Sequence, residues 1–162
     1  MDDTKEELKC QQINLQNSRV ATANLMKNTA DNKVVIICIQ EPYILQGRAA
    51  GIDTQYKIYT AGEARSRAAV IITNRKVDAT LITQLSDEDT ITLEITNGDT
   101  TIIRASMYFD RQKPLEHDLT KVDTILQHAK RKEQSLQWTA RPRRHHGTTQ
   151  QRTKGESTYK NT

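Results

Sequence analysis

The chain has 162 residues, of which 35% are apolar, and a formal net charge of +4. This length allows one domain with a hydrophobic core. No apolar run is long enough for a membrane helix, and the acidic N-terminus lacks the apolar segment of a secretion signal, so we expect a protein of the nucleus or cytoplasm that does not span a membrane.

The N-terminal part of the chain is expected to form a strand, a helix and a second strand. Residues 9–15 alternate and indicate a first strand, and Asn17 with Ser18 caps a helix over residues 19–31, with Asn32 as a left-handed stop. Residues 34–39 are apolar on both faces, which indicates a central buried strand. Short connections predict parallel pairing of the two strands. We expect the helix to bury one apolar face, made of Val20, Ala23, Met26 and Ala30.

A carboxylate follows the central strand directly. Pro42 cannot continue a β-ladder and biases Glu41 toward an extended conformation, so Glu41 is expected at the C-terminal edge of the sheet. Asn14, at the end of the first strand, is expected at the same edge, where open α/β sheets bind ligands. Glu41 is then either a solvated carboxylate or a ligand of a hard cation such as Mg²⁺, which accepts one or two carboxylates together with phosphate and water.

The next stretch is irregular, with one short strand at residues 56–59. Its arginines, Arg48, Arg65 and Arg67, either contact phosphates or are solvated loop charges, and the second interpretation is favoured. From residue 68 the pattern indicates a meander of strands at 68–73, 79–84, 90–96 and 100–108, with a hairpin at Asn97-Gly98. In the third of these strands the isoleucines and leucine are expected to face inward and Thr92 and Glu94 outward. A second helix should begin at Pro114 and bury Leu115, Leu119, Val122, Leu126 and Ala129.

The order of five segments carries a resemblance that no segment carries alone. They are Gln12-Ile13-Asn14-Leu15, Gln40-Glu41-Pro42-Tyr43, Arg67-Ala68-Ala69-Val70-Ile71-Ile72, Ser106-Met107-Tyr108-Phe109-Asp110 and the helix from Asp118 to Lys130. Together, over residues 11–132, they resemble the endonuclease domain of non-LTR retrotransposons, in the endonuclease/exonuclease/phosphatase superfamily. The resemblance implies a four-layer α/β sandwich, Mg²⁺-dependent hydrolysis of a DNA phosphodiester, and a reverse transcriptase elsewhere in the parent polyprotein.

The resemblance also implies roles for single residues. Glu41 matches the family's metal-binding glutamate, Asn14 the asparagine that helps to hold the metal and phosphate, and Tyr108 the tyrosine that reaches the scissile phosphate. The Asp and Asn pair that activates water and the late Asp and His pair cannot be placed in this chain. We therefore expect an incomplete sandwich without appreciable nicking activity, in which the sheet containing residues 34–39 keeps an uncovered apolar face, so that the protein is poorly soluble or needs a partner.

The end of the chain differs in composition from the rest. After Glu133, six Lys or Arg accompany one acid, so this part has a net charge of +5. We expect an extension at 1–8, a partial domain at 9–133 and a disordered basic tail at 134–162. Used as an electrostatic arm, the tail would make the chain a non-catalytic nucleic-acid or protein binder, which is the competing hypothesis.

The genetic code offers another explanation of this tail. In a shifted reading frame, the codons of Trp138 and Thr139 encode Asp, and the junction of Gln137 and Trp138 permits Met before it. The whole shifted reading permits Met-Asp-Ser-x-Ala, Trp-His-Asp and Asn-Gln-Arg-Gly, in the order of the family's missing motifs. We therefore hypothesise a slip of one or two bases between about Lys130 and Gln134, with a genuine disordered tail as the alternative.

Overall fold

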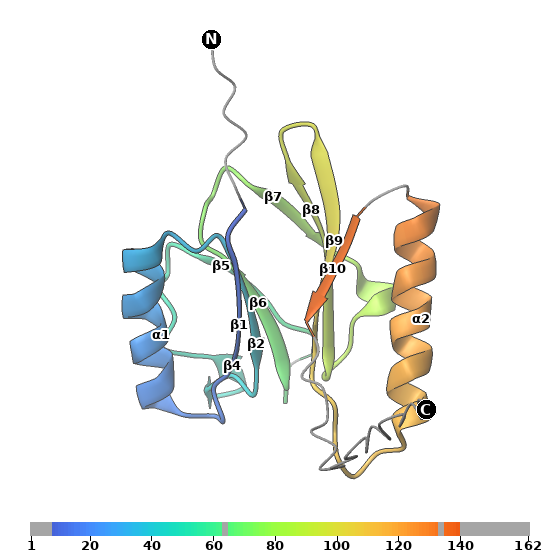
Figure 1. Ribbon diagram of the computed structural model, residues 1–162. Coiled ribbons are helices and arrows are strands. Elements are labelled where there is room, and N and C mark those ends of the chain that lie inside the picture. The colour runs from blue at the N-terminus through green and yellow to red at the C-terminus, as the bar shows by residue number, and fades with distance from the viewer. Residues whose placement is uncertain (1–7, 63–64, 133–134, 140–162) are drawn as a thin grey trace, which may run out of the picture.

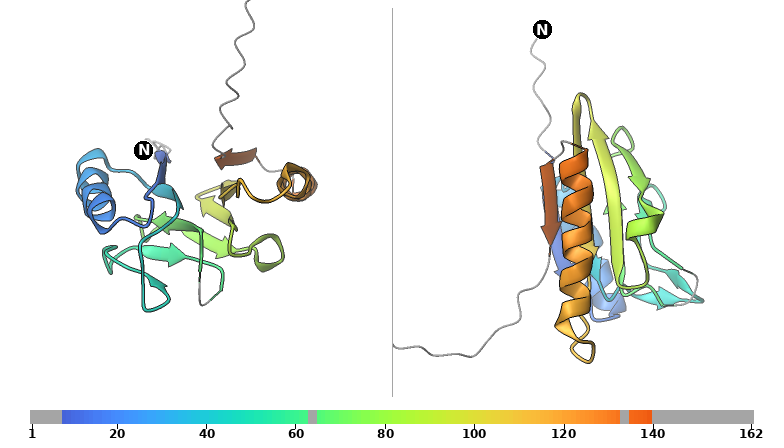
Figure 2. Two further views of the ribbon diagram at one scale, coloured as in Figure 1. Left: turned by 90° about the horizontal axis from the view of Figure 1, so that it is seen from below. Right: turned by 90° about the vertical axis from the view of Figure 1, so that its right-hand side faces the viewer.

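The computed structural model describes residues 8–62, 65–132 and 135–139, arranged as two helices that flank two facing sheets (Figure 1). The first sheet has the strand order β1-β2-β6-β5, and the second has the order β10-β9-β8-β7. Viewed from below, the layers follow one another as helix, sheet, sheet and helix (Figure 2). The predicted α/β sandwich is therefore present. No helix in the described residues is long and apolar enough to cross a membrane.

The first sheet contains the strands that lead to the candidate site. Strand β1 (Cys10–Asn14) runs parallel to β2 (Ile36–Gln40), and the helix α1 (Arg19–Asn32) connects them, as predicted. Strand β6 (Ala68–Ile72) lies antiparallel between β2 and β5 (Lys57–Tyr59). The sequence assigned β6 to a meander with the following strands. This was wrong, because β6 forms its hydrogen bonds with β2 and β5.

The second sheet contains the last three strands of the predicted meander and one further strand. It comprises β7 (Asp78–Leu81), β8 (Thr90–Asn97) and β9 (Thr100–Met107), with a 3₁₀ turn (Thr83–Leu85) between β7 and β8. The hairpin is confirmed, since Asn97 pairs with Thr100 and Gly98 adopts a φ of 58°. After helix α2 (Leu115–Arg131), β10 (Ser135–Thr139) pairs parallel with β9, so the segment expected as a tail begins with a strand. Residues 140–162 lie outside the described residues.

Helix α1 buries a different face from the one predicted. Helix α1 buries Thr22, Leu25 and Thr29 and leaves Val20 70% exposed. The apolar pattern predicted the wrong face because it treats threonine as exposed. Thr22 can be buried because its hydroxyl donates to the Ser18 carbonyl, at 2.9 Å. The helix also ends one residue later than expected, with Lys33 in the left-handed conformation at a φ of 52°.

The predicted face of helix α2 is confirmed in part. Ala129 is buried and Val122 packs against the same core, but Leu119 is 54% exposed and the helix also buries Asp118 and Ile125. Thr92 of β8, predicted to face outward, is fully buried, and its hydroxyl donates to the Leu85 carbonyl at 2.9 Å. The hydrogen bond of Thr92 explains why this polar side chain can be buried.

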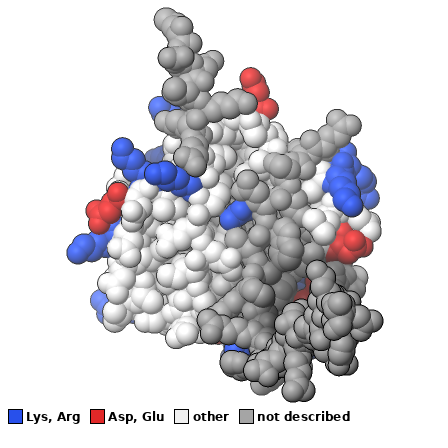
Figure 3. Space-filling view, viewed as in Figure 1, with Lys and Arg blue, Asp and Glu red and all other residues white. Residues whose placement is uncertain are grey.

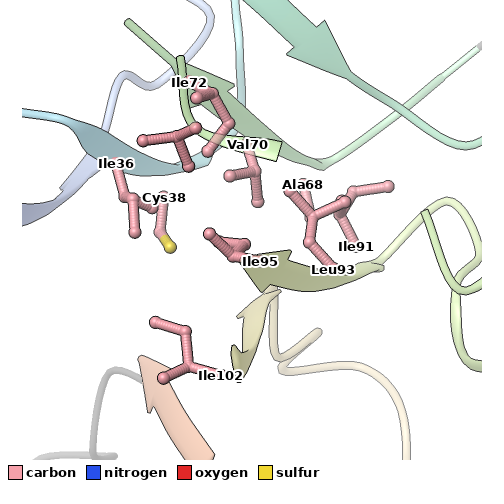
Figure 4. Packing of buried hydrophobic residues seen from close by; sticks show 10 residues of the cluster. Ile36, Cys38, Ala68, Val70, Ile72, Ile91, Leu93, Ile95 and Ile102 are labelled. Atoms are coloured by element: carbon pink, nitrogen blue, oxygen red, sulfur yellow. The ribbon is translucent and has the colours of Figure 1, made fainter. Parts of the chain in front are cut away.

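Strand β2 is buried on both faces. Ile36 and Cys38 pack in the core between the sheets (Figure 4), and Ile37 and Ile39 pack in a second core that includes Leu25 of α1. A third core joins β9 to α2. The expected uncovered apolar face on this sheet was therefore wrong, because α1 covers it, and this removes the reason for expecting poor solubility.

The face of α1 that packs on the sheet can be tested by two truncations. Leu25→Ala should lower the free energy of unfolding by about 2–5 kcal/mol, because it leaves a cavity beneath the helix. Val20→Ala should change it by no more than about 0.5 kcal/mol, because that side chain is mostly in water. Denaturant unfolding followed by circular dichroism measures both, and equal costs would show that the helix packs as the sequence predicted.

Candidate active site

The predicted site residues converge on the edge of the sandwich where β1 and β2 end. Asn14 pairs with Gln40, and the Asn17 N–H donates to the Glu41 carbonyl at 2.8 Å. Tyr108 directly follows β9 of the facing sheet. The structure therefore places Asn14, Glu41 and Tyr108 at strand ends that meet at one edge.

Two buried hydrogen bonds fix the facing sheets at this edge. The Ser106 hydroxyl donates to the Ile39 carbonyl at 3.0 Å, and the Gln40 side-chain amide donates to the Met107 carbonyl at 3.2 Å. Both donor side chains are almost completely buried. Because unpaired buried donors are costly, these bonds define how β9 lies against β2 and hence where Tyr108 lies relative to Glu41.

The backbone at this edge is strained. Glu41 adopts a φ of 48°, and Gln16 and Asn17 on the neighbouring strand end have φ values of 50° and 55°. The expected extended conformation of Glu41 was wrong. Its N–H donates to the Arg67 carbonyl at 2.8 Å while its own carbonyl accepts from Asn17, and these two bonds hold the residue in the left-handed region. Such conformations cost on the order of 1–3 kcal/mol each for residues other than glycine, and they gather at functional sites.

Arg67 connects the segments around Glu41. Its guanidinium donates to both carboxylate oxygens of Asp89, at 2.5 and 2.7 Å, and to Asp110 at 2.7 Å. Lys113 also donates to Asp89, at 2.7 Å. The guanidinium is therefore engaged by two carboxylates, which makes it neither a solvated loop charge nor an uncommitted phosphate ligand.

The titration of these groups follows from their contacts. Burial lowers the pKa of Arg67, but its hydrogen bonds to Asp110 and Asp89 raise the pKa by more. The pKa of Asp110 is lowered, first by the Gln112 backbone N–H and then by Arg67. The hydrogen bond to Asp89 raises the pKa of Lys113. At neutral pH the network therefore consists of two cations held between carboxylates.

Tyr108 contacts this network through Arg67 and lies close enough to Glu41 for its charge to act on the phenol. The Arg67 guanidinium lies over its ring, 5.1 Å from the ring centroid. Burial raises the pKa of the Tyr108 phenol, and the negative charge of Glu41 raises it further. The phenol therefore stays protonated at neutral pH and keeps a hydrogen-bond donor beside the Glu41 carboxylate.

The polar groups of the edge differ in whether they already have partners. The Asn14 side-chain oxygen accepts the Gln16 N–H at 2.8 Å, and Asp89 and Asp110 are paired with cations. Within the described part of the chain, the Glu41 carboxylate makes no hydrogen bond or ion pair. The same residues contain no group of three or more His, Cys, Asp or Glu that could hold a metal. The donor set therefore fits a cation of the Mg²⁺ type held by one carboxylate, with phosphate and water completing its shell.

Sequence reasoning missed Gln40, Ser106, Asp89 and Lys113. Asp89 follows Arg67 by 22 residues in a connection between strands, and nothing in the spacing indicates the pairing. Gln40 offered one signal, since a polar residue at the end of an apolar strand must find a buried partner if it stays inside.

Comparisons with known proteins identify the class of fold. Neither the models of protein families nor the curated proteins contain a match. Among solved structures, the chain is similar to humanized TDP2 from D. rerio (13% identity, TM-score 0.51) and to D. rerio TDP2 complexed with a single-strand DNA product (12% identity, TM-score 0.51). Each of these likenesses covers 74% of this chain, with 54% and 53% of the respective TDP2 chains. The chain has the endonuclease/exonuclease/phosphatase fold.

A more specific likeness agrees with the resemblance in the sequence. The chain is similar to the endonuclease domain of TRAS1, a telomere-specific non-LTR retrotransposon, with 26% identity and a TM-score of 0.64. The match covers 78% of this chain and 55% of the TRAS1 domain. The predicted fold is thus confirmed, and the chain spans about half the length of the domains that it resembles.

The strain at Glu41 gives a prediction that separates conformation from charge. Glu41→Gly should be about 1 kcal/mol more stable than Glu41→Ala, because only glycine adopts a positive φ without steric cost. At Glu94, in the extended strand β8, the order should reverse, with glycine less stable than alanine. Thermal unfolding of the four variants measures this, and the same order at both positions would contradict the left-handed conformation.

Proposed function

We propose that this chain is the N-terminal part of a metal-dependent DNA endonuclease domain of the kind found in non-LTR retrotransposons. The observation that carries the proposal is the Glu41 carboxylate, unpaired among the described residues and held at a strained strand end beside Tyr108. It lies in a fold shared with the TRAS1 endonuclease domain.

Three residues would perform the chemistry that this part retains. Glu41 would hold Mg²⁺, with the Asn14 amide beside it, and the metal would supply neutralisation of phosphate charge. Tyr108, kept protonated by its surroundings, would donate a hydrogen bond to a phosphate oxygen. Arg67 would act indirectly, as a positioning residue. Its guanidinium holds the Tyr108 ring, and its backbone carbonyl accepts the Glu41 N–H.

We also propose that this chain does not nick DNA. The resemblance requires an Asp and Asn pair for water activation and a late Asp and His pair, and neither can be placed in the sequence. Binding of metal and phosphate without a positioned base leaves the attacking water unactivated. The coverage of about half of the similar domains supports this view.

Several parts of the proposal concern the parent protein. DNA is the proposed partner, a reverse transcriptase the proposed neighbour in a polyprotein, and the nucleus or cytoplasm the proposed location. The frameshift near residues 130–134 stays a prediction, because the motifs it would restore fall mostly on residues outside those described.

Incubation of the full chain with supercoiled plasmid and Mg²⁺ tests this function. We expect no relaxation above background, because the water-activating groups are missing. Asp99→Ala, at the distant hairpin turn, is the matched control for Glu41→Ala. Relaxation by the wild type and Asp99→Ala that is lost in Glu41→Ala would contradict the expected inactivity and show a complete enzyme.

The competing binder hypothesis predicts a different result in the same preparation. Salt-sensitive DNA binding would then disappear when residues 138–162 are deleted and would not depend on Glu41.

A further inference from the structure

A short hairpin stands next to Glu41 in the sequence and at the same end of the sheet. Its strands are β3 (Ile44–Leu45) and β4 (Arg48–Ala49), and Ala50 N–H donates to the Tyr43 carbonyl at 2.9 Å to close its base. Figure 1 shows β4 at the lower end of the first sheet, the end toward which β1 and β2 run.

The turn of this hairpin has a defined conformation. Gln46 and Gly47 connect the paired residues Leu45 and Arg48, and both have positive φ values, 51° and 76°, as a type I′ turn requires. A two-residue turn of this type holds the two strands in a single register. The side chains at its tip are therefore presented in a fixed arrangement.

Two of these side chains lack partners in the domain. Leu45 is 55% exposed, and Arg48 is exposed and forms no ion pair with any described residue. Since Leu45 and Arg48 are directly opposite each other in the hairpin, they lie on the same face. That face presents an apolar and a cationic group together, four and seven residues after Glu41.

A cleft lies beside the hairpin. It has a volume of about 610 Å³ and is lined by residues 46–49 of the hairpin and by Ile58, Thr60 and Gly62. Among the described residues of the lining, the charged group is the guanidinium of Arg48. Ile58, at 38% exposure, adds apolar surface to the wall. The cleft is therefore suited to a ligand that combines negative charge with flat apolar surface.

We propose that the β3–β4 hairpin and this cleft bind the duplex DNA that flanks the phosphate at Glu41. Arg48 contacts a backbone phosphate, and Leu45 packs against the base edges of the adjacent groove, as apolar side chains do in proteins that enter the minor groove. This inference rests on the proposed function for the identity of its ligand. The location of the hairpin beside Glu41 and the cationic Arg48 in the cleft lining favour DNA over an apolar protein partner.

Fluorescence anisotropy with a labelled duplex, in the absence of divalent metal, tests the proposal over a salt series. Arg48→Ala should make the slope of log K against log salt shallower by about 0.9, the value for one phosphate contact. Leu45→Ala should weaken binding by the same factor at every salt concentration, because it removes an uncharged contact. The two residues thus leave different signatures in one data set.

Helix α2, on the opposite side of the sandwich from the first sheet, offers matched controls (Figure 2). Leu119 is 54% exposed and Arg131 is exposed in the last helical turn, so Leu119→Ala and Arg131→Ala should both bind DNA as the wild type does. The proposal is overturned if Arg48→Ala keeps the wild-type slope or if Leu45→Ala binds like its control. Absence of duplex binding by the wild type would also overturn it.

The endonuclease proposal can fail separately. Because the hairpin contacts need no metal, Arg48→Ala and Leu45→Ala should have the same effects on metal-free duplex binding in a Glu41→Ala background as in the wild type. If Mn²⁺ binds at Glu41 but Arg48→Ala and Leu45→Ala bind duplex DNA as the wild type does, the hairpin proposal alone is refuted. If Arg48→Ala and Leu45→Ala change duplex binding as expected but no metal binds at Glu41, the endonuclease proposal is refuted. The hairpin would then remain a DNA-binding surface.

Discussion

The burial of β2 on both faces is the constraint on which the rest of the structure depends. Its five residues are almost completely shielded from water, between α1 on one side and the second sheet on the other. Complete burial of an isoleucine stabilises a fold by about 1.5–3 kcal/mol, and β2 buries three of them. This stabilisation is larger than the conformational cost of a left-handed Glu41, which is about 1–3 kcal/mol. The fold can therefore hold an acidic residue in a strained conformation at the end of its most buried strand.

The same edge depends on contacts between segments far apart in the chain. Arg67 accepts the Glu41 N–H, pairs with Asp89 through two hydrogen bonds and lies over Tyr108. These contacts satisfy the cation within the protein and leave Glu41 as the unpaired carboxylate of this edge, among the residues that the structure describes. Because the cations of this edge are paired and the Glu41 carboxylate has no partner among the described residues, this carboxylate is available to bind a cation. Figure 3, which views the molecule from one side, shows Lys and Arg scattered over that face between uncharged areas.

The sequence predicted the parts of the fold that follow from local patterns. Alternation, the Ser18 cap and the Asn97-Gly98 turn identified most elements, and the short joints around α1 predicted that β1 and β2 are parallel. Patterns failed where a tertiary contact decided the outcome. Nothing in the apolar run of β6 says which strands it joins, and buried threonines such as Thr22 hide the packed face of a helix. The roles of Asn14, Glu41 and Tyr108 came from the resemblance alone, and they stay predictions.

The location of a bound divalent metal shows directly whether Glu41 is a metal ligand. Mn²⁺ prefers the same oxygen ligands as Mg²⁺ and broadens the NMR signals of nearby nuclei. We expect selective broadening of the amide signals of Leu15, Asn17, Glu41 and Tyr108, with Lys33 and Val35 at the opposite end unaffected, and loss of the effect in Glu41→Ala. Broadening that is spread over the surface acids, or that persists unchanged in Glu41→Ala, would contradict a metal site at the end of β2.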